Sequence, residues 1–93
     1  MIKAKLTITH ESGLKARTAA LFVQAASKFA ARIWLEKGSK KVDGKSIMGL
    51  LSLAVSKGDE ILVVVDGKDE NEAMEAITRF LESDFADTDA MIG

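Results

Sequence analysis

Hydrophobic and polar residues alternate strictly at the beginning of this chain. Ile2, Ala4, Leu6 and Ile8 fall on one side of an extended backbone, and lysines and threonines occupy the positions between them. A period of two is typical of a strand with one buried face. Such a strand needs a covering layer on one side, so the sequence predicts a half-buried strand in a layered fold.

The hydrophobic period then changes to that of a helix and back again. From Ala16 onward, apolar residues recur at spacings of three and four, which predicts a helix with one buried stripe at Ala19, Phe22, Val23, Ala26 and Phe29. Residues 32–37 alternate again. There Ile33 and Leu35 face one side and Trp34 the other, and residues 40–43 are short enough to be the return strand of a hairpin.

The second half of the chain predicts a short helix, a strand and a last helix. Ser46 precedes the apolar run 47–53, which predicts a short helix with a serine N-cap. Residues 60–66 are rich in valine and predict a strand. Asp69 and Glu72 have the spacing of a capping box at the start of a last helix. Its expected buried stripe is Ala73, Ile77 and Leu81.

The order strand, helix, strand, strand, short helix, strand, helix predicts an α+β fold. Four strands and two long helices make a two-layer sandwich, an antiparallel sheet with the helices on one face. A chain of 93 residues without proline or cysteine has room for one domain, which we assign to residues 1–85. Residues 86–93 are small and acidic, and we expect a frayed tail there.

Composition excludes several classes of function. Without cysteine and with a single histidine, His10, we expect no metal site, no cofactor and no self-sufficient enzyme. His10 is in phase with the core side of the first strand and is expected to end that strand. No apolar run approaches the roughly 20 residues of a membrane span, so we expect a cytoplasmic protein. The lysines between Lys37 and Lys45 lack interleaved aromatic residues, which favours a solvated hairpin over a nucleic-acid site.

Two short stretches carry a specific resemblance. Gly13-Leu14-Lys15-Ala16-Arg17-Thr18-Ala19 resembles the phosphoacceptor loop of HPr, the small carrier of the bacterial sugar phosphotransferase system. Residues 45–53, Lys-Ser-Ile-Met-Gly-Leu-Leu-Ser-Leu, resemble the regulatory serine site of the same family. The resemblance implies the HPr-like open-faced sandwich, βαββαβα, which agrees with the order of elements read from the periodicity.

The acceptor loop departs from the family at its functional centre. The resemblance places Lys15 where HPr has a histidine that receives phosphate from Enzyme I, and Thr18 where it has a proline. A neutral imidazole offers a nitrogen lone pair near pH 7, whereas a lysine ammonium does not. The chain therefore looks like the Crh-type branch of the family, which also lacks that histidine. Crh-type proteins carry glutamine there, so Lys15 departs from both groups.

Spacing alone gives Ser46 no function beyond capping a helix, but the resemblance implies that it is the regulatory phosphorylation site. The implied partners are HPr kinase/phosphorylase, which uses ATP, and the transcription regulator CcpA in carbon catabolite control. Lys40, Lys41 and Lys45 are expected near the phosphate.

Partner contacts are expected at five positions. Lys15 and Arg17 place two cations at the positive end of the first helix, which is unfavourable unless an anion binds there. The short helix cannot bury all of its apolar residues, and we expect Leu50 and Leu53 to point inward. The expected contact residues are Lys15, Arg17, Ile47, Met48 and Leu51.

Two other functions remain open at this point. One is a phosphocarrier that relays phosphate between Enzyme I and the sugar carriers. The other is an oligomerisation or small-ligand domain without phosphorylation.

The uncovered face of the sheet carries a further expectation. Trp34, Leu62 and Val64 alternate with core residues and so fall on the face away from the helices. An exposed tryptophan among aliphatic residues suggests weak homodimer formation through that face. Alternatively, Phe85 or the acidic tail covers it.

Overall fold

The computed structural model describes residues 1–9 and 13–82. The expectations for His10, Phe85 and the tail 86–93 lie outside these residues. The described elements follow in chain order: β1(Ile2–Thr7), α1(Ala16–Ala26), β2(Arg32–Lys37), β3(Lys40–Asp43), α2(Ile47–Leu53), β4(Glu60–Asp66) and α3(Glu70–Glu82). This is the βαββαβα order expected from the sequence.

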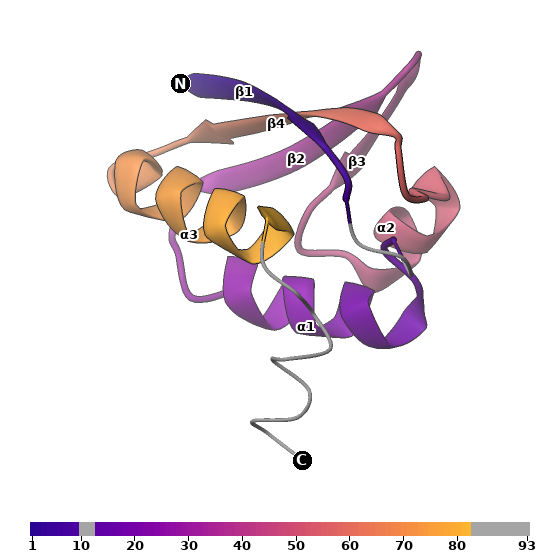
Figure 1. Cartoon of the computed structure of the whole chain (residues 1–93). Coiled ribbons are helices and arrows are strands. Elements are labelled where there is room, and N and C mark those ends of the chain that lie inside the picture. The colour runs from indigo at the N-terminus through magenta and orange to yellow at the C-terminus, as the bar shows by residue number, and fades with distance from the viewer. Residues whose placement is uncertain (10–12, 83–93) are drawn as a thin grey trace.

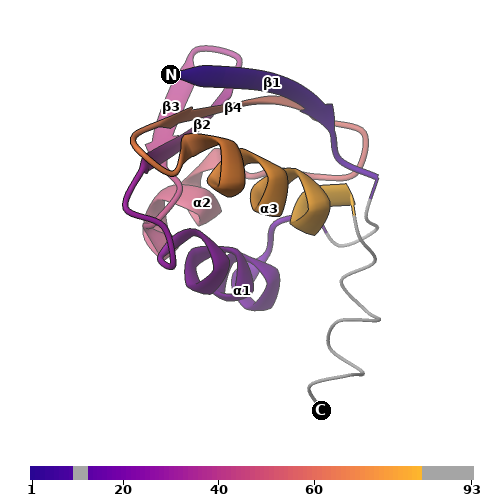
Figure 2. The same cartoon turned by 90° about the vertical axis from the view of Figure 1, so that its left-hand side faces the viewer.

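The four described strands form one antiparallel sheet in the order β1-β4-β2-β3. The central strands β4 and β2 pair so that Val65 lies between Ile2 of β1 and Ile33 of β2. Figures 1 and 2 show all three helices on one side of this sheet, with α1 and α3 side by side. The chain is therefore an open-faced α+β sandwich, as predicted.

The core lies between the sheet and the helices. Ile33 and Leu35 of β2 are buried there, and Phe22 of α1 meets Phe80 of α3 edge to face, with ring centroids 5.7 Å apart. Ala73, Ile77 and Leu81 form the buried stripe of α3, as expected from their spacing. Phe29 belongs to the core but not to the helix, because α1 ends at Ala26 and Phe29 packs from the following turn.

The helix-free face differs from the prediction of an exposed tryptophan. Trp34 is half-buried rather than exposed, and Val64 is completely buried. In the sheet, Val64 lies directly between Trp34 and Lys3, so these large neighbours on the same face cover it. Self-association through this face stays a prediction, now without the exposed tryptophan that suggested it.

The predicted capping box at the start of α3 is wrong. The Asp69 carboxylate accepts hydrogen bonds from the backbone N–H groups of Ala30 and Ala31, each at 2.9 Å. Asp69 therefore joins the start of α3 to the loop between α1 and β2. The hydrogen bond between residues close in sequence at the start of α3 is made by Glu70 instead, whose carboxylate accepts from the Gly67 N–H at 3.1 Å.

We predict that Asp69→Ala lowers stability in a pH-dependent way. The hydrogen bond from the Ala30 N–H, ahead of that from Ala31, lowers the pKa of the Asp69 carboxyl against the cost of its burial. A pKa lower in the folded than in the unfolded state gives stability above the unfolded pKa, which is lost as pH falls through the folded one. The free energy of unfolding of the variant should thus differ from wild type at pH 7, and the difference should shrink below pH about 4.

Denaturant titrations from pH 7 to strongly acidic pH measure this difference. Glu75→Ala, which removes an exposed partner of Arg79, serves as the control and should cost less. A difference for Asp69→Ala that stays constant throughout the acid range contradicts the assignment.

Candidate functional site

The loop before α1 is held against the segment that follows α2. The Leu14 N–H donates to the Val55 carbonyl at 3.1 Å. Gly13 has a φ of +59°, and a Cβ at this position would lie 2.3 Å from the Val55 oxygen. Only glycine combines this backbone conformation with so close an approach. The contacts of Gly13 and Leu14 with Val55 therefore fix the position of Lys15.

Thr18 closes the same loop from inside the helix. Its side chain is buried, and its hydroxyl accepts from the Lys15 N–H at 2.9 Å while it lies 2.9 Å from the Gly13 carbonyl, to which it donates. This role was missed in the sequence analysis, where Thr18 appeared only as a departure from the family. The sequence feature that indicates this role is a hydroxyl residue three positions after the N-cap residue, because from there the hydroxyl reaches the N-cap N–H.

The start of α1 presents two cations to solvent. Lys15 is the N-cap residue, and both Lys15 and Arg17 are exposed. The first turn of α1 contains no acidic residue. The positive end of the helix therefore adds to the charge of the two side chains, and an anion is the group that this surface favours.

Ser46 is the N-cap residue of α2, as predicted. Its hydroxyl oxygen accepts from the Gly49 N–H at 3.1 Å, and the Leu50 N–H donates to its carbonyl at 3.0 Å. The side chain is half-buried. A group attached to this oxygen would begin at the end of the helix where backbone N–H groups point outward.

The apolar residues of α2 divide as the sequence predicted. Leu50 and Leu53 are buried, whereas the exposed fractions are 41% for Ile47, 77% for Met48 and 37% for Leu51. With Met1, these three are the large hydrophobic residues exposed in the described part of the chain. We call Ile47, Met48 and Leu51 the α2 patch.

The hairpin lysines are not simply solvated, because two of them bind the end of α2. Lys37 Nζ donates to the Ala54 carbonyl at 2.8 Å and pairs with Asp59 at 2.9 Å, while Lys40 Nζ donates to the Ser52 carbonyl at 3.2 Å. Cations at a helix C-terminus satisfy its free carbonyls and oppose its dipole. The hydrogen bond from Lys37, ahead of that from the Ser56 N–H, lowers the pKa of Asp59.

The three lysines expected near a phosphate on Ser46 all have other contacts in the structure. Lys40 reaches the far end of α2, and Lys41 lies over the ring of Trp34. The Lys45 ammonium donates to the Phe29 carbonyl at 2.6 Å. Each of these lysines therefore contacts a group other than Ser46.

The two candidate sites lie at opposite ends of one short helix. Ser46 begins α2, and the loop that carries Lys15 is bonded to Val55, just after α2 ends. The α2 patch occupies the turns between them. In Figure 1, α2 and the start of α1 lie at the same end of the molecule. One partner surface can therefore cover the cations, the patch and Ser46 together.

Other kinds of site have little support in residues 1–9 and 13–82. No group of three histidine or acidic side chains there is placed to hold a metal ion. No helix in the same residues has the length and apolar character needed to cross a membrane.

These features define a small open-faced sandwich with an exposed apolar patch on α2. The chain belongs to the HPr family of the phosphotransferase system: the family described as "PTS HPr component phosphorylation site" matches residues 2–83.

Relatives of known sequence include both branches of that family. The chain is 48% identical over 84 residues to the HPr-like protein Crh of Halalkalibacterium halodurans, covering 90% of this chain and 100% of the relative. It is 42% identical over 87 residues to phosphocarrier protein HPr of Neisseria meningitidis, covering 94% and 98%. Neither relative is named as a conventional enzyme.

Solved structures agree with the fold. HPr-C-His from Thermoanaerobacter tengcongensis superposes with a TM-score of 0.88 at 49% identity, covering 92% of this chain and 97% of the other. Crh of Bacillus subtilis superposes with a TM-score of 0.72 at 48% identity, covering 88% and 94%, and its structure is described as a dimer with a swapped domain. Members of the family thus form dimers in structures.

We predict that Gly13→Ala destabilises the protein more than Gly38→Ala. Both glycines have a φ near +60°, but no atom lies within 4 Å of a Cβ at position 38. The control substitution should cost about 1 kcal/mol for its left-handed backbone. At position 13 the clash with Val55 adds about 1 kcal/mol or more. Equal free energies of unfolding in denaturant would show that the loop does not depend on this close approach.

Proposed function

We propose that this chain is an HPr-like regulatory protein of the phosphotransferase system, phosphorylated on Ser46 by HPr kinase/phosphorylase. The phosphorylated protein acts in carbon catabolite control through contacts with a CcpA-type transcription regulator. The observation that carries the proposal is Ser46 at the start of α2, directly beside the α2 patch. In this proposal the chain is a phosphoacceptor in the cytoplasm, where ATP and the partners are found, and not an enzyme.

The chemistry of Ser46 supports this role. The Ser46 oxygen attacks the γ-phosphorus of ATP, the bond from that phosphorus to the β,γ-bridging oxygen breaks, and ADP and a proton leave. The new phosphate adds about −1.5 to −2 charge beside the first N–H groups of α2, where negative charge is stabilising. It also changes the charge at the rim of the α2 patch. A partner that binds this patch can therefore distinguish the phosphorylated protein from the unphosphorylated one.

Lys15 and Arg17 complete the proposed partner surface. A partner that carries acidic side chains would meet two cations at the start of α1 and apolar side chains on α2. Charges at the rim of such a surface guide association, and apolar side chains at its centre supply affinity. The same surface is available to Enzyme I, with which contact remains part of the proposal.

The histidine carrier reaction is lost in this proposal. Lys15 stands at the family's acceptor position, and its ammonium has no lone pair with which to attack phosphorus near pH 7. The alternative carrier function therefore requires an acceptor that the start of α1 does not supply.

We predict that Ser46→Asn abolishes phosphorylation by HPr kinase/phosphorylase with ATP while the protein remains folded. Asparagine caps a helix about as well as serine, whereas Ser46→Ala should cost about 1 kcal/mol. Intact-mass measurement after incubation reports the phosphate, and Ser52→Ala, which changes an exposed serine on the same helix, should leave it unchanged. Phosphate that persists in Ser46→Asn on Ser39, Ser52 or Ser56 contradicts the assignment.

We predict that Lys15→His gains phosphate from Enzyme I and phosphoenolpyruvate, whereas wild type does not. The substitution returns an imidazole lone pair to the start of α1. Lys15→Ala is the matched control, since it removes the cation without supplying a nucleophile. Thr18→Pro, added to Lys15→His, tests whether the loop held by the Thr18 hydroxyl limits the reaction. If the wild-type protein accepts as much phosphate as the Lys15→His variant, this prediction is wrong and the chain is a carrier.

The two reactions together separate the three functions. A regulatory protein gains mass only with the kinase and ATP, and a carrier gains it with Enzyme I and phosphoenolpyruvate. A domain without phosphorylation gains mass in neither.

A further inference from the structure

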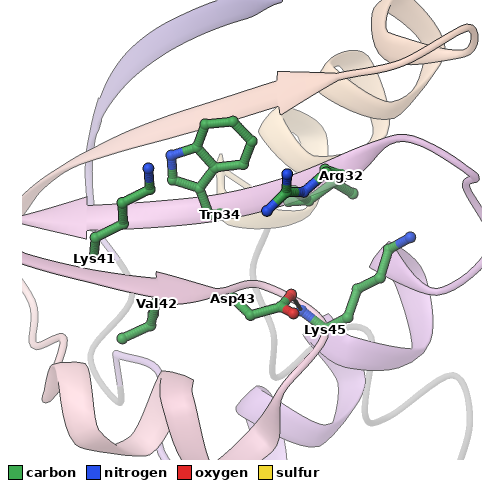
Figure 3. Close-up of a pocket in the computed structure, with 7 residues that line it drawn as sticks. Arg32, Trp34, Lys41, Val42, Asp43 and Lys45 are labelled. Carbon is green, nitrogen blue, oxygen red and sulfur yellow. Dashed lines mark hydrogen bonds between the residues drawn. The ribbon is translucent and has the colours of Figure 1, made fainter.

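A cavity of about 330 Å³ lies at the β2–β3 edge of the sheet. Arg32 and Trp34 of β2, Lys41 and Asp43 of β3, and Lys45 of the following turn contribute to its lining. Figure 3 shows the Trp34 ring, Arg32 and Lys41 on the side of the strands away from α2. Its volume is at the lower end of the range for small-molecule sites.

Trp34 is one of three apolar residues in the lining of this cavity, with Ile33 and Val42. The ring is half-buried, and two cations approach it: the Arg32 guanidinium carbon lies 5.7 Å from the ring centroid and the Lys41 ammonium 4.6 Å. Such contacts hold cations near a ring without neutralising them. Both charges therefore stay available to an anion.

The Trp34 Nε1–H is a buried donor without an acceptor. It is the one buried side-chain nitrogen or oxygen, within the residues that the structure describes, that makes no hydrogen bond. Buried donors in native proteins nearly always have a partner, so an unpaired one indicates a missing acceptor. In Figure 3 the Lys41 ammonium lies on the same side as this nitrogen, so a single acceptor can serve both groups.

The charges around the cavity are unbalanced. Asp43 is the acidic residue in its lining, and its carboxylate already accepts from the Lys45 N–H at 2.8 Å. The cross-strand neighbours of Arg32 and Lys41 are Asp66 and Glu36, but no ion pair joins any of these carboxylates to Arg32 or Lys41 in the described residues. The cavity therefore favours a ligand of negative charge.

We propose that this cavity binds a small phosphate monoester. The phosphate accepts from the Lys41 ammonium and from the Trp34 Nε1–H, and the organic part packs over the indole. Arg32, on the other side of the ring in Figure 3, adds positive charge to the cavity. A hydroxyl of that organic part donates to Asp43. The flexible Lys41 side chain shifts from the ring face to admit the phosphate. This site goes beyond the proposed function and does not depend on phosphorylation of Ser46.

Trp34 is the only tryptophan of the chain, so its fluorescence reports binding directly. The probes are ribose 5-phosphate, AMP, inorganic phosphate and ribose, each titrated into the full chain. We expect a saturable change with ribose 5-phosphate, AMP or both, and an affinity at least about tenfold weaker for inorganic phosphate and for ribose. A preference between the two esters identifies the organic part as a sugar or as a nucleoside.

Variants test the assignment of residues. Lys41→Ala should weaken binding about tenfold, because it removes a charge-assisted contact with the phosphate. Arg32→Ala removes a more distant positive charge of the lining and should weaken binding less. Lys68→Ala removes an exposed cation outside the cavity and should leave binding unchanged, as should Ser46→Asn. The proposal is overturned if neither ester saturates, if inorganic phosphate binds as tightly as both esters, or if Lys68→Ala weakens binding as much as Lys41→Ala.

Discussion

The structure depends on the burial of one face of a four-stranded sheet beneath three helices. Ile33 and Leu35 of β2 and Val63 and Val65 of β4 are buried on that face. Two of the helices are long enough to cover most of it. The third, α2, has seven residues and buries only Leu50 and Leu53. Apolar residues on the rest of α2 must therefore face solvent, and the α2 patch is a direct consequence of the architecture.

The ends of α2 are fixed by contacts from distant parts of the chain. Ser46 caps its first turn, and Lys37 and Lys40 of the β2–β3 hairpin bind its last carbonyls. The Leu14 N–H then joins the Val55 carbonyl, which brings the start of α1 to the far end of α2. A surface assembled from three separate segments thus gains a defined shape. Such pre-organisation lowers the entropy lost when a partner binds.

Local patterns predicted the elements well because each element has one dominant periodicity. The bounds of β2, β3, α2 and β4 agree with the sequence analysis, and Ser46 is the N-cap that its position before an apolar run indicated. The hydrogen-bond predictions that failed concern polar side chains whose partners are distant in the sequence. Asp69 binds backbone groups 38 and 39 residues away, and Lys37 binds Ala54, 17 residues away. No periodicity contains that information, because it arises only when the layers pack.

The phosphorylation chemistry that we propose depends on the two ends of α2. One end carries the Ser46 oxygen at the start of the helix. The other end adjoins the loop of Lys15, which the resemblance to HPr places at the acceptor position. Phosphorus NMR of the wild-type protein tests both statements, with the protein purified from two separate incubations, one with kinase and ATP and the other with Enzyme I and phosphoenolpyruvate. We expect a single phosphate-ester resonance from the serine and no resonance from a phosphorus–nitrogen bond. A phosphorus–nitrogen resonance, or the absence of the ester resonance, would contradict this account.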